Sequence, residues 1–229
     1  MKPMFVLFCA MILVSGLWGQ STKTYNQKAD SDPEAKAMLE RVRKKYESYP
    51  TLEAEFSLAI EVPEQPKEVQ RGKIQQKGAK YRIEFSGQTV ISDGKSIWIV
   101  LSQNKEVQIN HLPDAEEDEA ILSPQSLFRI YEKGSFAYTI VNEYSATGKI
   151  LQEIEFKPLD RYSEYSKLRL TVDKKTANFL EIKGFTKDGT RYTLTMTKLT
   201  PNKPLTDAVF TFNKANYPGF HIEDLRNQD

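Results

Sequence analysis

Few residues in the chain are of the types that carry acid–base or nucleophilic chemistry. His111 and His221 are the only histidines, and the one cysteine, Cys9, lies in an apolar N-terminal run. A catalytic hydroxyl or thiol needs a neighbouring base, and no serine or cysteine here lies in a recognisable nucleophile motif. The sequence therefore predicts that the protein is not an enzyme, and no catalytic residue is assigned.

An acidic run lies in the middle of the chain, at Asp114, Glu116, Glu117, Asp118 and Glu119. Carboxylates can bind calcium, but a calcium-binding loop also needs a glycine and regularly spaced oxygen ligands, which this run lacks. We predict a solvated loop at this position, with no metal and no cofactor.

Aromatic side chains such as Tyr81, Phe85 and Trp98 could stack on flat ligands. The chain has 32 basic and 31 acidic residues, so its composition gives no sign of a basic groove for phosphates. Nucleic acid is therefore not expected as a partner, whereas sugar binding remains open.

The first nineteen residues have the features of an export signal. Lys2 supplies a positive start, Met4 to Leu13 an apolar core, and Ser15 to Gly19 a cleavage region of mainly small residues. The apolar core is too short to span a membrane, although a retained N-terminal anchor is the alternative. We predict a signal peptide at 1–19, a flexible leader at 20–31 and one domain at 32–229.

Removal of residues 1–19 would take away Lys2 and Cys9, leaving a chain without formal net charge and without cysteine. Such a chain forms no disulfides, so its stability must come from its core. It also has no cysteine that could be acylated. The expected product is an exported, soluble and unanchored protein.

A helix is predicted over residues 33–49. Asp32 suits the N-cap position and Pro33 the first helical position, and Pro50 ends the helix. Apolar residues recur at three- and four-residue spacing, which we interpret as core packing rather than a ligand surface. They are Ala35, Met38, Leu39, Val42, Tyr46 and Tyr49.

After residue 50 the apolar period changes to two, which is typical of strands. Turn signals such as Asp93-Gly94 separate roughly eleven strands without βαβ alternation, so we predict a single antiparallel sheet. Among these strands are 52–62, 97–101, 192–199 and, last in the chain, 208–212. A second short helix, starting at Ser123-Pro124, interrupts them.

The strand Ile97-Trp98-Ile99-Val100-Leu101 has no polar face, so both of its faces must be covered. A wide antiparallel sheet curls, and two short helices cover little of its apolar side. The concave side is predicted to hold an apolar cavity, occupied either by a ligand or by the protein's own side chains. The pattern does not decide which face of 97–101 lines that cavity.

The run from Leu39 to Leu112 resembles the LolA family of outer-membrane lipoprotein carriers. The resemblance rests on Tyr81-Arg82-Ile83 and on the block Ile91-Ser92-Asp93-Gly94-Lys95-Ser96-Ile97-Trp98. The C-terminal segments Phe210-Thr211-Phe212-Asn213, Tyr217-Pro218-Gly219 and Glu223-Asp224-Leu225-Arg226 are also similar to this family. The resemblance implies an unclosed antiparallel β-barrel with a helical lid over an apolar cavity.

The resemblance also implies a function and its site residues. The cavity would hold the acyl chains of lipoproteins, and the segment Ser123–Lys133 would be part of the lid. The family often has an Arg-Pro pair whose arginine bonds the lid; here Lys77-Gly78 stands in its place, so Lys77 is carried over as a lid contact. The expected cavity residues are Phe56, Leu58, Ile60, Tyr81, Ile83, Phe85, Trp98, Ile99, Val107 and Ile109, and the expected lid residues are Leu127, Phe128, Ile130 and Tyr131.

The expected role follows from the family. An inner-membrane Lol ABC transporter would release acylated lipoproteins to this chaperone, which would carry them as a monomer through the periplasm. The outer membrane would receive them, in some bacteria through a LolB-type receptor. The alternative is a lipid-binding or lipoprotein-sensing regulatory module on the same half-barrel.

Overall fold

The computed structural model describes residues 27, 30–112, 129, 131–132 and 134–226 of the 229-residue chain. The predicted signal peptide and the lid residues Leu127, Phe128 and Ile130 lie outside this part. Within the described residues, no helix has both the length and the apolarity that crossing a bilayer requires. The elements are α1 (Pro33–Glu47), β1 (Thr51–Glu61), β2 (Glu68–Lys77), β3 (Lys80–Phe85), β4 (Gln88–Ser92), β5 (Ser96–Leu101), β6 (Glu106–His111), β7 (Phe136–Ala146), β8 (Lys149–Pro158), β9 (Tyr165–Asp173), β10 (Phe179–Thr186), β11 (Arg191–Pro201), the 3-10 helices η2 (Asp207–Phe210) and η3 (Lys214–Asn216), and β12 (His221–Asp224).

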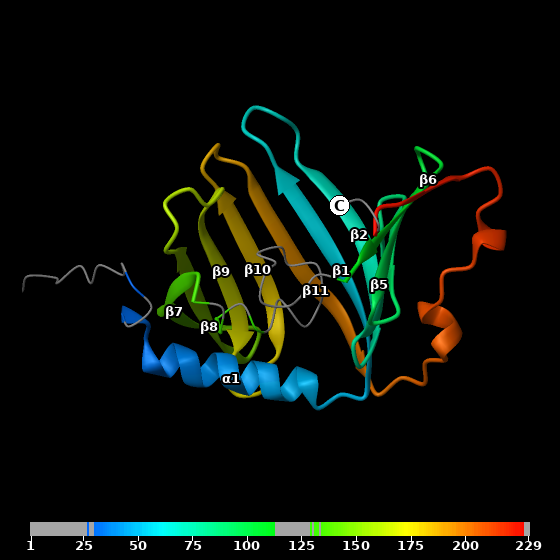
Figure 1. The fold of residues 1–229 in the computed structure, drawn as a ribbon. Coiled ribbons are helices and arrows are strands. Elements are labelled where there is room, and N and C mark those ends of the chain that lie inside the picture. The colour runs from blue at the N-terminus through cyan, green and yellow to red at the C-terminus, as the bar shows by residue number, and fades with distance from the viewer. Residues whose placement is uncertain (1–26, 28–29, 113–128, 130, 133, 227–229) are drawn as a thin grey trace, which may run out of the picture.

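Twelve strands form one open sheet in the order β12-β6-β5-β4-β3-β2-β1-β11-β10-β9-β8-β7. Neighbouring strands run antiparallel except β12, which pairs in parallel with β6. The sheet bends into an arch, and α1 crosses its concave side at the lower end (Figure 1). The prediction of an unclosed, mainly antiparallel β-structure is confirmed, with twelve strands in the sheet.

The end of the chain differs from the prediction. Residues 208–212 were expected to form a strand, but Asp207–Phe210 is a 3-10 helix and the last strand is His221–Asp224. The alternation of Phe210 and Phe212 has another cause: Phe210 is buried, and Phe212 stacks on Trp98 at 5.9 Å between ring centroids. Strand β12 is only four residues long, which leaves almost no periodicity to detect.

Helix α1 begins and packs as its sequence predicts. Asp32 accepts a hydrogen bond from the Glu34 amide at 2.8 Å, and Pro33 follows as the first helical residue. The predicted apolar stripe lies in the main core against β7 to β10, with five of its residues buried and Tyr49 half-buried. Tyr46 accepts a hydrogen bond from the Phe179 amide at 3.1 Å, and burial raises the pKa of the Tyr46 hydroxyl to about 12.

Strand register divides the side chains into a concave and a convex set, because paired residues point to the same side of a sheet. Leu52 pairs with Gln76, which pairs with Tyr81, then Ser92 and Ile97 across the sheet. Leu52 belongs to the core under α1, so this row faces the concave side. The alternate row, which contains Arg82, Ile91 and Trp98, faces the convex side.

The C-terminal segment, which here means residues 203–226, covers the convex side of β3 to β6 (Figure 1). Trp98, Phe212, Tyr217 and Phe220 form a continuous run of ring contacts, each with centroids 5.4 to 5.9 Å apart. The carboxylate of Asp207 pairs with Lys77 at 2.8 Å and with Lys80 at 3.1 Å. The convex-facing residues Ile91, Val100, Val107 and Ile109 are buried. Because the C-terminal segment buries the convex side of β5, this strand is apolar on both of its faces.

Candidate ligand-binding face

The structure brings seven of the ten predicted cavity residues to the concave face. Phe56 and Phe85 share one cross-strand row, through Gly72, and Ile83 and Ile99 share the next, through Val90. The strand alternation places the others on the same side. The concave set is Phe56, Leu58, Ile60, Tyr81, Ile83, Phe85 and Ile99.

The other three predicted cavity residues, Trp98, Val107 and Ile109, lie on the convex face, and the prediction is corrected for them. Trp98 pairs with Ile91 and Ile109, and Val107 pairs with Val100. The alternation in β6 was read correctly, but its apolar side faces the C-terminal segment. The concave side of β6 presents Glu106, Gln108 and Asn110 instead.

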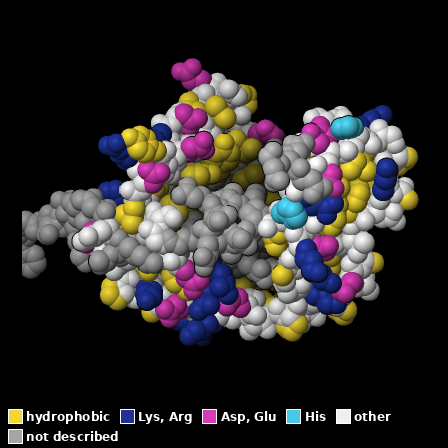
Figure 2. All heavy atoms as spheres, in the orientation of Figure 1, with side chains coloured by type: hydrophobic (Ala, Val, Ile, Leu, Met, Phe, Trp, Pro, Cys, Tyr) yellow, Lys and Arg dark blue, Asp and Glu magenta, His cyan; other side chains and the backbone are white. Residues whose placement is uncertain are grey.

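On the concave face, side chains become less buried along each strand with distance from α1. In β1, Leu52, Ala54 and Phe56 are buried, whereas Leu58 and Ile60 are only half-buried. In β5, Ile97 is buried, whereas Ile99 and Leu101 are half-buried. Figure 2 looks onto this side and shows hydrophobic side chains deep in a recess, with charged ones around it. An apolar surface thus continues beyond the part that α1 covers.

Gly72 shapes the middle of this surface. It lies opposite Phe56 in β1 and Phe85 in β3, and a Cβ atom on it would lie 2.3 Å from the Phe56 ring. The ring of Phe56 therefore occupies the space above Gly72. It reaches toward Phe85, with ring centroids 6.5 Å apart. The absent side chain lets two aromatic rings from non-adjacent strands form one apolar patch.

Lys77, the predicted lid contact, points to the convex side. Its ammonium pairs with Asp207 and lies 3.5 Å from the Leu205 carbonyl oxygen, both in the C-terminal segment. Lys77 follows the concave residue Gln76 in β2, and successive side chains of a strand point to opposite faces, so Lys77 points to the convex side. We therefore give Lys77 a structural role in holding the C-terminal segment.

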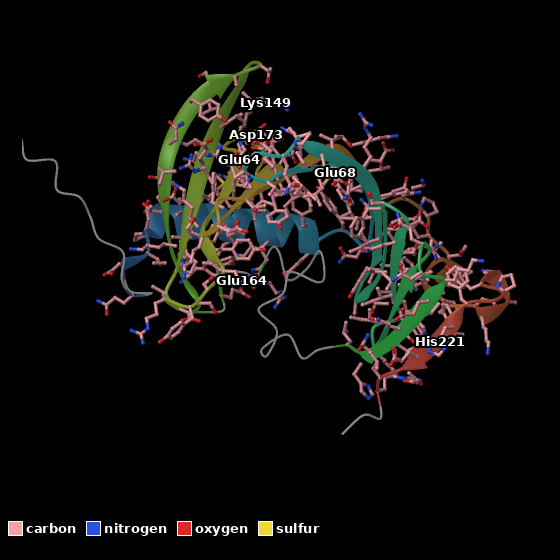
Figure 3. All side chains as sticks on the ribbon, turned by 90° about the horizontal axis from the view of Figure 1, so that it is seen from above. Glu64, Glu68, Lys149, Glu164, Asp173 and His221 are labelled. Atoms are coloured by element: carbon pink, nitrogen blue, oxygen red, sulfur yellow. The ribbon has the colours of Figure 1, made fainter. Side chains whose placement is uncertain are left out.

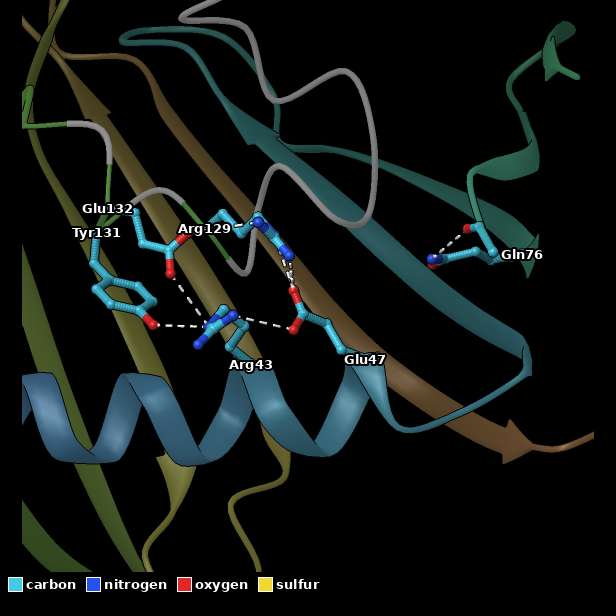
Figure 4. Close-up of polar contacts among 7 residues, drawn as sticks. Arg43, Glu47, Gln76, Arg129, Tyr131 and Glu132 are labelled. Carbon is cyan, nitrogen blue, oxygen red and sulfur yellow. Dashed lines mark hydrogen bonds and ion pairs between the residues drawn. The ribbon is translucent and has the colours of Figure 1, made fainter. Parts of the chain in front are cut away.

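An arginine on α1 binds the described part of the predicted lid segment (Figure 4). Arg43 donates a hydrogen bond to the Tyr131 hydroxyl at 3.0 Å, which is the main cause of the raised pKa of Arg43. It also pairs with Glu132 at 3.3 Å and with Glu47 at 3.2 Å. Arg129 pairs with Glu47 at 2.6 Å. Sequence reasoning missed Arg43, because a solvated helix face gives the same charge pattern.

Tyr131 is the one predicted lid residue within the described part of the chain, and it is buried. Its ring packs edge-on against Tyr138 of β7, with centroids 6.1 Å apart, and burial raises the pKa of its hydroxyl. Tyr131 is thus part of the core that α1 forms with β7 to β10.

Beyond α1, the concave face presents mainly aliphatic and aromatic side chains on β1, β3 and β5. Both histidines are exposed, and within the described residues no group of His, Cys, Asp and Glu has a geometry that could hold a metal ion. The acidic run at 114–119 lies outside the described residues. The half-buried aliphatic and aromatic side chains suit an apolar ligand.

Solved structures that are similar to this chain come from several bacteria. An uncharacterised conserved protein of Thermus thermophilus has a TM-score of 0.56 at 12% identity, covering 83% of this chain and 99% of its own. A LolA superfamily protein of Nitrosomonas europaea has a TM-score of 0.41 at 14% identity, covering 78% and 97%. A putative outer membrane lipoprotein-sorting protein domain of Vibrio parahaemolyticus has a TM-score of 0.43 at 14% identity, covering 80% and 99%.

A search of curated proteins gave no significant match. The profile of one family, described as outer membrane lipoprotein carrier protein LolA, matches residues 47–213. The match begins at the end of α1, includes strands β1 to β11 and ends just after η2. It therefore contains the whole apolar concave surface of β1 to β5. Since this match takes in most of the sequence, the chain belongs to the LolA family.

Proposed function

We propose that this protein is a periplasmic carrier that shields the acyl chains of lipoproteins on its concave face. The observation that carries the proposal is the continuous apolar surface of β1 to β5 beyond α1, with half-buried Leu58, Ile60, Ile83, Phe85 and Ile99. Family membership supports the same role. The cargo would be received from an inner-membrane Lol ABC transporter and delivered to the outer membrane, in some bacteria through a LolB-type receptor.

The energetics of the cargo explain why such a surface is needed. Each methylene group removed from water contributes about 0.8 kcal/mol, so acyl chains do not leave a membrane without cover. The carrier must also release them. A half-buried floor already has part of its apolar area out of water before the cargo arrives, which limits the free energy gained on binding.

The segment around Tyr131 is included in the proposal as part of a lid. Arg43, Glu47 and Glu132 tie its described residues to α1, next to the concave face. The roles proposed for Leu127, Phe128 and Ile130 rest on the sequence. If Leu127→Glu and Ile130→Glu left lipoprotein binding unchanged, the lid assignment would be wrong.

The proposal is tested by isolating the protein from the periplasm and identifying co-purifying molecules by mass spectrometry. Acylated lipoproteins are the expected result. Phospholipid alone would contradict the carrier role and favour a lipid-binding module. Absence of the protein from the periplasmic fraction would contradict export.

Two variants test the proposed face. Ile99→Glu places a charge on the concave surface and is expected to reduce lipoprotein recovery strongly. Val69→Glu is the matched control, because Val69 is an aliphatic residue on the convex side, 50% exposed. Circular dichroism checks that both variants fold. Equal recovery from both folded variants would rule out the concave face.

A further inference from the structure

The strands carry their charges very unevenly between the two faces. Each lysine and arginine within β1 to β12 points to the convex side, as the register places it. Lys73 and Arg82 are examples, each in the row next to a concave residue. The full strand set is Arg71, Lys73, Lys77, Lys80, Arg82, Lys149, Lys157, Lys167, Arg169, Lys183, Arg191 and Lys198.

Many convex cations have acidic partners on the same side. Lys73 pairs with Glu53 at 2.9 Å, and Arg169 pairs with Glu155 at 2.7 Å. Where α1 meets the described part of the predicted lid segment, Arg43 is already held by Glu47 and Glu132, and Arg129 is held by Glu47. Within the described strands, the concave face therefore offers no lysine or arginine to a ligand.

Amides and carboxylates surround the apolar floor instead. Gln70 donates to Glu68 at 2.7 Å in β2, and Gln108 donates to Glu106 at 2.6 Å in β6. All four side chains face the concave side, and Glu223 of β12 lies beside Gln108. Glu68, labelled in Figure 3, is the first residue of β2, the strand that lies between β1 and β3.

Charge complementarity follows from this arrangement. An anionic headgroup next to an acyl chain would find no countercharge on the concave strands and would meet carboxylates at Glu68 and Glu106. A peptide offers backbone N–H donors to carboxylate and amide oxygens, and a cationic side chain would pair with the same acids.

We propose that the concave face selects cargo by charge: it binds an acyl chain joined to a neutral or cationic peptide more tightly than one joined to an anionic group. The proposal rests on the proposed function, since it assumes that acyl chains bind this face. The selecting residues are Glu68, Gln70, Glu106 and Gln108.

The test uses N-palmitoylated peptides that share one acyl chain and carry an oligoserine, an oligolysine or an oligoglutamate sequence. Binding to the mature protein is measured by calorimetry below the aggregation concentration of each peptide. We expect the oligoglutamate peptide to bind about three- to fivefold more weakly than the oligoserine one, the size of one or two exposed charge interactions. High salt should narrow this difference.

Variants assign the selection to named residues. Glu68→Gln with Glu106→Gln should reduce the difference between peptides, and Glu55→Gln, a carboxylate on the convex side of β1, should leave it unchanged. Gln70→Lys should strengthen binding of the oligoglutamate peptide, whereas Gln75→Lys, on the convex side of the same strand, should not. Gln88→Lys, at an exposed concave position, keeps the test available if Gln70→Lys does not fold.

The possible results separate the two proposals. Equal affinity for all three peptides would overturn charge selection and leave acyl binding intact. Binding of none would contradict acyl binding, and charge selection with it. If the double variant Glu68→Gln with Glu106→Gln still bound the oligoglutamate peptide more weakly, other residues would cause the selection. That result would overturn the proposal that Glu68 and Glu106 select cargo.

Discussion

At the scale of single residues, Gly72 determines how the apolar floor is built. The Phe56 ring lies where a Gly72 side chain would be, and the Glu84 carbonyl oxygen would be 2.7 Å from the same Cβ position. One neighbour is a buried ring and the other is backbone, so neither moves easily. The two rings of Phe56 and Phe85 depend on this vacancy for their packing.

Gly72→Ala is therefore expected to lower the free energy of unfolding by about 1 to 3 kcal/mol, the usual cost of overpacking a core. Urea denaturation followed by circular dichroism measures it. In a Phe56→Leu background the ring is gone, so the same Gly72→Ala change should cost less. An equal cost in both backgrounds would show that the strain comes from the backbone alone.

Individual residues also show what the sequence could and could not predict. Alternation in β1 correctly places Leu58 and Ile60 on one side, because the other side of that strand carries the carboxylates of Glu53, Glu55 and Glu61. In β6 alternation fails for Val107 and Ile109, because the C-terminal segment shields the side that solvent would otherwise cover. In β5, which is apolar on both sides, alternation could not place Trp98. Apolar alternation shows that one face of a strand is buried, whereas the register of the strand in the sheet determines which part of the chain buries that face.

At the scale of elements, the start of α1 fastens the helix to the edge strand β7. Asp32 caps the helix through the Glu34 amide, and its own amide donates to the Tyr138 carbonyl oxygen at 2.8 Å. The other carboxylate oxygen accepts from the Ile140 amide at 3.4 Å. The N-cap was readable from Asp32-Pro33, but the contact with β7, more than a hundred positions away, depends on the tertiary fold.

Asp32→Ala should cost about 1 kcal/mol of stability through the lost cap alone, and somewhat more through the freed Ile140 amide. Asp32→Asn keeps an oxygen acceptor and should cost less. Thermal unfolding of both variants measures the difference, and native-state hydrogen exchange should show faster exchange at Ile140 in Asp32→Ala only. Identical melting of the two variants would argue against the cap.

At the scale of the whole molecule, the two sides of the arch are covered by different parts of the chain. Helix α1 packs on the concave side of β7 to β10, where it shares one core with Ile154, Phe156 and Leu170. The C-terminal segment packs on the convex side of β3 to β6, through Phe210 and Phe212. Helix periodicity predicted that α1 covers the concave side. The C-terminal segment consists of two short 3-10 helices, a four-residue strand and irregular chain, which are too short to show a period.

Removal of residues 203–229 should therefore affect one half of the sheet more than the other. It would expose Ile91, Val100 and Val107, which are almost fully buried, and would leave the core under α1 in place. Exposed apolar area costs about 25 cal/mol per Å², so β3 to β6 should lose most of their protection from hydrogen exchange while β8 to β10 keep theirs. A chain ending at Gly219 is the matched control, since it lacks β12 but retains Phe210 and Phe212. Uniform loss of protection in the shorter chain would mean instead that the whole sheet unfolds as one unit, with no part of its stability confined to either half.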